Sequence, residues 1–137
     1  LLMWYSIAIN PKSISSLFGE EEPCLEGVNI FKVILEYNGP SFTIIFDVNN
    51  YPKNPPEKWK RQNFNKAQIT VQLWDIEEVI IEGWYTVNTA NISFERLNHQ
   101  ELIFKLIGSD CRMNMKFQWM QVNATGYTND EVFKALT

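Results

Sequence analysis

The sequence is poor in the residue types that build metal and catalytic centres. Of 137 residues, one is histidine (His99) and two are cysteine (Cys24 and Cys111), which we interpret as buried free thiols. A histidine-based metal cluster needs more than one imidazole, and structural zinc sites use closely spaced cysteine pairs. The six glycines are isolated from one another, which excludes a glycine-rich phosphate loop. We therefore expect no metal, no cofactor and no enzymatic activity.

Basic residues are also too few for a nucleic-acid-binding protein. The chain has 12 Lys and Arg against 16 Asp and Glu, giving a net charge of -4 and a pI of about 5.0. Binding to phosphates requires a basic face, so a direct nucleic-acid partner is not expected. An acidic surface can instead attract a basic protein partner.

Long hydrophobic runs and targeting signals are missing as well. No stretch approaches the ~18 consecutive apolar residues of a membrane span, so no membrane association is expected. The first residues lack a basic segment followed by an apolar run, which is the pattern of a secretory signal peptide. The sequence therefore predicts a cytoplasmic protein.

Carboxylates are the remaining source of catalytic chemistry. Glu77, Glu78 and Glu82 lie close together, with Asp75 nearby. Two of them could serve a glycosidase-type mechanism only if they faced one cleft. Strand alternation puts Glu78 and Glu82 on one face, with Ile80 between them. We interpret them as an acidic stripe that faces solvent or a partner.

The length favours one domain over residues 1–137. Asn10 and Pro11 predict a short helix over residues 10–18, because Asn caps helices and Pro suits the first helical position. A second short helix is expected after Asn129. The apolar stripe of the first helix consists of Ile14, Leu17 and Phe18.

From Val28 onward the hydrophobic period changes to two, which is typical of antiparallel strands with one buried face. Asn38-Gly39 between two such segments predicts a hairpin. The expected buried faces are Phe31, Val33, Leu35 and Tyr37; Phe42, Ile44, Phe46 and Val48; Ala67, Ile69, Val71 and Leu73; Ile92 and Phe94; Leu102, Phe104 and Leu106; and Cys111, Met113, Met115, Phe117 and Trp119. We expect an α+β, mainly β fold, in which an antiparallel twisted sheet with meander connections carries a short N-terminal helix. Alternation alone leaves a curled open sheet, a sandwich and a partial barrel as alternatives.

Residues 49–65 predict a long loop, because its three prolines cannot donate to a strand ladder. Its aromatic content predicts order. Trp59 either packs to pin the loop or anchors a partner. Trp74 falls on the polar face of its strand, where it is a candidate interface anchor or is covered by other elements. Trp84 is expected to fill a core or strand-end position.

An ordered series of residues resembles the Imm50 type of bacterial immunity protein from polymorphic toxin systems. The matching residues are Met3-Trp4, Leu17-Phe18-Gly19, Pro23, Phe46-Asp47, Pro52, Asn54-Pro55-Pro56, Lys58-Trp59, Asn65 and Glu82-Gly83-Trp84. The resemblance implies a cytoplasmic protein, encoded beside a toxin, that neutralises the toxin domain by stoichiometric binding. It does not transfer any interface residues.

Two further hypotheses stay beside this one: a β module that binds an apolar or carbohydrate ligand, and an enzyme that uses paired carboxylates. For the immunity hypothesis, the cognate toxin domain is the expected partner, and the acidic charge suggests that it is basic. The candidate partner-binding residues are Glu20, Glu21, Glu22, Trp59, Trp74, Glu78 and Glu82.

Overall fold

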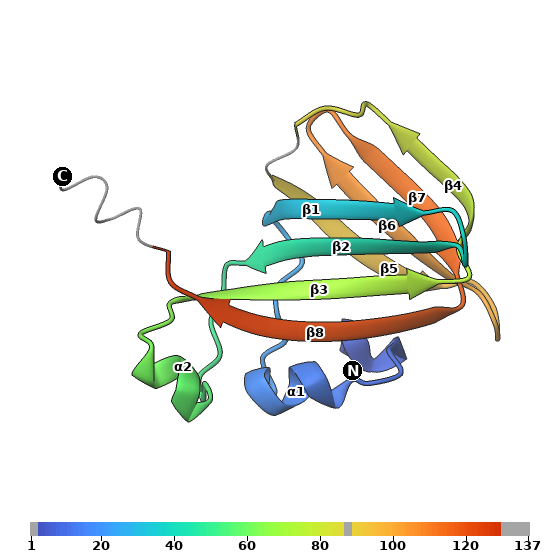
Figure 1. Cartoon of the computed structure of the whole chain (residues 1–137). Helices are drawn as coiled ribbons and strands as arrows, with labels where there is room; N and C mark the ends of the chain where they lie inside the picture. The colour runs from blue at the N-terminus through green and yellow to red at the C-terminus, as the bar shows by residue number, and fades with distance from the viewer. Residues whose placement is uncertain (1–2, 87–88, 130–137) are drawn as a thin grey trace.

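The computed structural model describes residues 3–86 and 89–129. These residues form an open, eight-stranded antiparallel sheet with the strand order β4-β7-β6-β5-β1-β2-β3-β8 (Figure 1). Neighbours within β1–β3 and within β5–β7 are joined consecutively, as expected for a meander. The strands are β1 (Val28–Glu36), β2 (Ser41–Val48), β3 (Lys66–Trp74), β4 (Glu77–Glu82), β5 (Thr89–Arg96), β6 (Leu102–Gly108), β7 (Arg112–Phe117) and β8 (Trp119–Tyr127).

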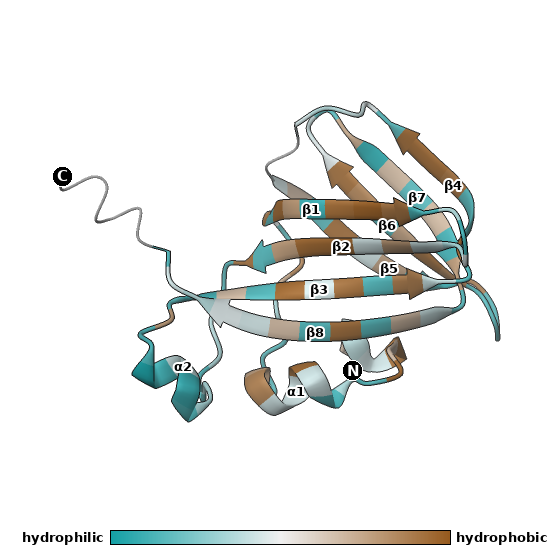
Figure 2. Ribbon diagram, in the orientation of Figure 1, coloured by the Kyte–Doolittle hydropathy of each residue, from teal (hydrophilic) through white to brown (hydrophobic). Residues whose placement is uncertain are grey.

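The sheet curls so that its two halves face each other. Figure 1 shows β5 crossing behind β1, β2 and β3, with β6, β7 and β4 fanning out beyond it. The rings of Phe42 on β2 and Phe104 on β6 lie 5.4 Å apart, so the inner faces of the two halves share one core. Figure 2 shows hydrophobic and hydrophilic residues alternating along the front strands. The prediction of a mainly β, antiparallel sheet is confirmed, and the curled open sheet is the alternative that holds.

The N-terminal segment bridges the two halves of the sheet. A short 3-10 helix, η1 (Trp4–Ile7), is followed by α1 (Lys12–Phe18), whose Ile14 and Phe18 are buried. The indole of Trp4 stacks on Phe94 of β5 at 5.6 Å, while the Ile9 N–H donates to the Met120 carbonyl of β8 at 2.8 Å. The segment therefore joins the edge strand β8 to the rear half of the sheet.

Asn10 has a different role from the predicted one. It makes no cap, and α1 begins at Lys12 with Pro11 at the N-cap position. The Asn10 side chain instead binds β8: its Nδ2 donates to the Val122 carbonyl at 2.8 Å, and its Oδ1 accepts from the Val122 N–H at 2.9 Å. One amide side chain thus bonds both backbone groups of Val122, as a neighbouring strand would.

Strand β1 departs from the predicted alternation. Its ladder with β2 has a β-bulge between Ile30 and Lys32, which places the exposed Phe31 out of phase. Tyr37, also predicted to be buried, is 99% exposed beyond the end of the strand. The Asn38-Gly39 hairpin between β1 and β2 is confirmed, and Gly39 has the positive φ (69°) that such a turn requires.

The long loop after β2 is ordered and packed. It contains the five-residue α2 (Glu57–Arg61), whose exposed residues are hydrophilic (Figure 2). The ring of Trp59 lies 5.9 Å from Tyr51 and 6.2 Å from Phe64. Trp59 and Phe64 cover Gly126 of β8 so closely that an added Cβ would meet their ring atoms at 2.8 and 2.7 Å. Glycine at this position allows the loop to seal one end of the core.

Two other predictions concern the cysteines and the end of the chain. Cys111 is buried as expected, whereas Cys24 is exposed. Cys24 lies in the loop before β1, where its N–H donates to the Asn50 side chain. The helix predicted after Asn129 lies outside the described residues.

Candidate protein-binding site

Two tryptophans lie side by side on the outer face of the front half-sheet. Trp74 ends β3 and Trp119 begins β8, and the two residues are direct cross-strand partners. The next pair in the ladder, Leu73 with Met120, is fully buried, so alternation directs both indoles away from the core. Trp74 is 36% exposed and Trp119 is 54% exposed. The predicted position of Trp74 on the polar face is confirmed.

Trp119 was expected on the buried face and lies on the opposite one. The alternation of Met113, Met115 and Phe117 ends with β7, because Gln118 breaks the strand and donates its N–H to the Trp74 carbonyl at 3.1 Å. Alternation then restarts in β8 with Met120 and the other inner residues. Phe117 and Met120 are both buried but lie three residues apart, whereas buried residues of one continuous strand lie two apart. This spacing was the signal in the sequence for a break between two strands. The sequence analysis also missed β8 as a separate strand.

Carboxylates at the start of β4 follow Trp74 closely in the chain and meet Glu101 of the β5–β6 loop. β4 begins with Glu77 and Glu78, three and four residues after Trp74, and Lys116 lies three residues before Trp119. The Glu78 carboxylate forms an ion pair with Lys116 Nζ at 3.1 Å, and Glu77 is the cross-strand partner of Lys116. Glu101, just before β6, accepts a hydrogen bond from Asn98 Nδ2 at 2.9 Å. We call the set Trp74, Trp119, Glu77, Glu78, Glu101 and Lys116 the tryptophan corner.

The carboxyls of this corner influence each other's protonation. A hydrogen bond between Glu77 and Glu101 raises the pKa of Glu77, with smaller contributions from desolvation and nearby negative charge. Hydrogen bonds from Asn98 and Glu77 lower the pKa of Glu101. A hydrogen bond to Glu78 raises the pKa of Lys116. Three carboxyls around one ammonium leave the corner with a net negative charge at neutral pH.

A shallow groove of about 380 Å³ extends from Trp119. One wall comes from the N-terminal segment, where Ile9 is 62% exposed, and the other from the β5–β6 hairpin with Arg96 and His99. Neither Glu77 nor Glu101 lines this groove. Glu77 and Glu101 therefore do not face each other across this groove, as the two catalytic carboxyls of a glycosidase face each other across its cleft. A groove lined by aromatic, apolar and polar side chains together is instead typical of a protein-binding surface.

The remaining candidate on β4 lies away from this corner. Glu82 ends β4 opposite Arg112, five residues from Glu77 and so roughly 15 Å along the strand. A β-bulge interrupts the predicted alternation between Glu77 and Ile80. Glu78 nevertheless reaches Lys116, which shares a face of β7 with Arg112, so Glu78 and Glu82 do lie on one face.

Trp84, expected in a core or strand-end position, lies two residues past the end of β4 and is 69% exposed, so it is not in the core. The reason lies at the preceding residue. Gly83 has a φ of 70°, and an added Cβ would lie 1.8 Å from the Asp110 carbonyl oxygen. This close backbone contact turns the chain out of β4, and the Trp84 side chain projects beyond the sheet core, where it borders a groove of about 310 Å³ with Phe31 and Tyr85.

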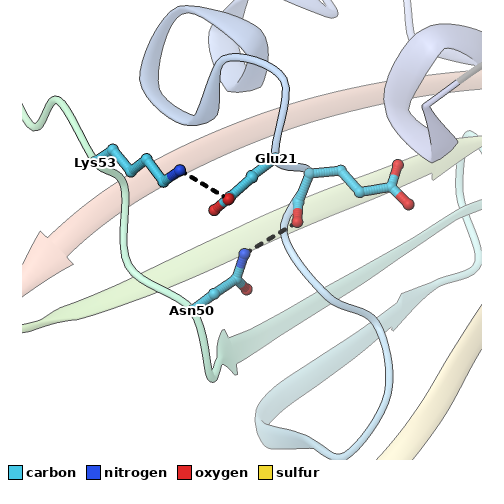
Figure 3. Close-up of polar contacts among 4 residues, drawn as sticks. Glu21, Asn50 and Lys53 are labelled. Carbon is cyan, nitrogen blue, oxygen red and sulfur yellow. Dashed lines mark hydrogen bonds and ion pairs between the residues drawn. The ribbon is translucent and has the colours of Figure 1, made fainter.

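The acidic segment Glu20–Glu22 lies near the opposite end of the front half-sheet. All three residues are exposed, and Glu21 pairs with Lys53 at 2.9 Å (Figure 3). The Glu22 carbonyl accepts a hydrogen bond from Asn50, just past the end of β2. Trp74 pairs with Ser41 at the other end of β2, which is roughly 20 Å away for an eight-residue strand. The structure does not bring this segment and the tryptophan corner together.

Trp59 occupies an internal position. It is 8% exposed and packs against Tyr51, Phe64 and Gly126, so in this structure it pins the loop. Within the described ranges, no three His, Cys, Asp or Glu residues are placed to hold a metal ion. Across those same residues, no helix has the length and apolar character needed to traverse a bilayer.

Comparison with known proteins identifies the family. The profile of one protein family, described as immunity protein 50 (Imm50), matches residues 10–127. The chain belongs to the immunity protein 50 family. The match covers α1 and all eight strands of this family member, including both tryptophans of the corner. No curated protein and no solved structure matches the chain.

Proposed function

We propose that this member of the immunity protein 50 family binds a toxin domain in the cytoplasm and neutralises it by stoichiometric occlusion. The tryptophan corner is the observation that carries this proposal. It combines two exposed tryptophans, one of which borders a groove, with a cluster of carboxylates on the same sheet. Partly exposed tryptophans surrounded by polar groups are the usual anchors of protein interfaces.

The charge of the corner favours a basic surface on the toxin domain. Glu77, Glu78 and Glu101 share a single cation, Lys116, and the whole chain carries a net charge of -4. A negative rim accelerates encounter with a positive partner and disfavours other partners. Inhibition by this route requires no bond making or breaking in the immunity protein.

The other candidate residues have different places in this proposal. Glu82 and the Glu20–Glu22 segment lie outside the corner and would contact the toxin domain only if the interface extended across the sheet. Trp59 would act indirectly by fixing the loop, because little of its side chain is exposed.

A co-expression experiment tests the proposed function. The toxin domain encoded next to this protein is produced in a sensitive host, with and without the immunity protein. We expect survival only when both are present, together with a stable 1:1 complex on co-purification. Toxicity without rescue, or rescue without a complex, would contradict neutralisation by binding.

Substitutions in the corner then test its location. Trp74→Ala and Trp119→Ala should each leave the fold intact, and we expect an increase in Kd of about 30-fold, equivalent to about 2 kcal/mol for an interface tryptophan. Gln121→Ala, on the same outer face but without an aromatic ring, is the matched control. If Kd changes only in a variant with Glu20, Glu21 and Glu22 replaced by Lys, the interface lies at the acidic segment instead.

A further inference from the structure

The two edge strands of the sheet differ in whether their outward backbone groups are hydrogen-bonded. β8 forms one edge, and its backbone is occupied by the Ile9 N–H and by both groups of the Asn10 side chain. β4 forms the other edge, and no residue in the described ranges bonds its outward backbone groups. An unpaired strand edge presents a row of donors and acceptors to any extended chain that approaches it.

The side chains of β4 restrict which chain can bind there. Glu77, Glu78 and Glu82 flank the apolar Val79 and Ile80, of which Ile80 is 53% exposed. Figure 2 shows this alternation of hydrophilic ends and a hydrophobic stretch on β4. If a second copy paired antiparallel through the centre of β4, Glu82 would come opposite Glu77 or Glu78. Like charges directly opposite each other destabilise a strand pair, so self-pairing is disfavoured and a cationic strand is favoured.

β4 is also continuous with the tryptophan corner. Glu77 and Glu78 belong to both, and Trp74 lies three residues before the strand begins. A partner held at Glu77 and Glu78 could therefore extend along β4.

We propose that the β4 edge accepts an extended, basic segment of the partner as a ninth strand. Main-chain hydrogen bonds would hold the segment, its Lys or Arg side chains would pair with Glu78 and Glu82, and an apolar residue would cover Ile80. The identity of the partner as a toxin domain rests on the proposed function, whereas the strand-accepting edge is a property of this chain alone and is tested without a toxin.

The test uses the full chain and a ten-residue synthetic peptide in which lysine and valine take turns at every second position, with threonine between them, so that one face of the extended peptide carries lysine, valine and lysine in succession. Amide chemical shifts are followed by NMR during the titration. We expect saturable shifts at Glu77–Glu82 and none at Val122, whose backbone is already bonded. The same peptide with glutamate in place of lysine should give no shifts, because the edge is acidic.

Two variants separate strand pairing from simple charge attraction. A lysine–valine peptide N-methylated at alternate residues loses donors on one edge, and its affinity should fall by about tenfold or more for two or three lost hydrogen bonds. A Glu78→Gln, Glu82→Gln variant should bind the unmodified peptide about fivefold more weakly. Glu95→Gln, on the outer side of β5, is the matched control and should change nothing.

The proposal is overturned if the peptides with and without N-methyl groups bind equally, if the shifts spread over all acidic surfaces, or if no binding occurs. Any of these outcomes would leave the rescue experiment and the immunity function unaffected. Conversely, the toxin domain could form a complex in which amide exchange at Glu77–Glu82 is unchanged. That result would contradict the ninth strand and would still support the proposed function.

Discussion

Gly126 is the residue at which the aromatic loop and the sheet depend on each other. Its missing side chain admits the rings of Trp59 and Phe64 onto the inner end of β8. Gly126→Ala should reduce the free energy of unfolding by about 1–3 kcal/mol, because the ring atoms and the strand backbone would have to move apart. Chemical denaturation measures this change. Thr125→Ala, exposed on the same strand, should stay within about 0.5 kcal/mol of the parent. An equal effect in both variants would mean that loop packing is not the cause.

The contact between Glu77 and Glu101 leads to a prediction about the pKa of Glu77. Because Glu101 is the main cause of the raised pKa of Glu77, Glu101→Gln should lower the pKa of Glu77. Carboxyl ¹³C shifts during a pH titration measure it, and Glu95→Gln should leave it unchanged. The folded chain holds the Glu77 proton more tightly than the unfolded chain does. Glu77 therefore contributes stability below its folded pKa, and this contribution is lost as pH rises through that value. An unchanged Glu77 titration in Glu101→Gln would contradict the assigned cause.

Edge strand β8 is the element for which one side chain replaces a neighbouring strand. Asn10→Ala removes both bonds to Val122, and we expect a loss of about 1–3 kcal/mol in the free energy of unfolding, because the Val122 side chain is buried and its backbone groups lose partners. Asn123→Ala changes an exposed asparagine on the same strand and is the control. Denaturant titration of both variants checks the prediction. If Asn10→Ala is as stable as Asn123→Ala, water satisfies Val122 equally well.

The elements differ in how far the sequence predicts them. β2 and β3 are central in the front half-sheet and regular over their whole length, so their alternation maps directly onto burial. β1, β4 and the β7–β8 junction contain a bulge or a break, and each shifts the phase by a residue. Hydrophobic periodicity does not locate such shifts unless a step such as Phe117 to Met120 is noticed. Trp119 was misplaced for this reason.

The site was only partly predictable for a related reason. The outward position of Trp74 was predicted correctly because its strand is regular. Its partner Trp119 lies 45 residues further along the chain. Their adjacency depends on β3 pairing with β8, a long-range contact that no local pattern shows. The coupling of Glu77 with Glu101 likewise requires β4 and the β5–β6 hairpin to meet. Composition predicted an acidic surface rich in aromatics but not where its parts would converge.

At the scale of the whole molecule, net charge governs how a partner arrives. With a charge of -4 and acidic patches at both ends of the sheet, association with a basic toxin domain should slow by about tenfold or more between 50 and 500 mM salt, while dissociation changes little. Stopped-flow kinetics at several salt concentrations measures both rates. Replacing Glu77 and Glu78 by Gln should flatten the salt dependence more than replacing Glu20 and Glu21. A dissociation rate that carries most of the salt effect would contradict electrostatic steering.

The Asn10 clamp on β8 has a consequence for assembly. A molecule whose sheet could be extended on both sides would be a repeating unit, since each added strand would offer a new edge to the next molecule. Here one side is already finished by the chain itself. Strand pairing is therefore blocked at Met120 and Val122 of β8, and a second molecule joined at β4 would present its own blocked side outward. Such a protein ends a chain of sheets instead of propagating one, which limits aggregation through strand edges.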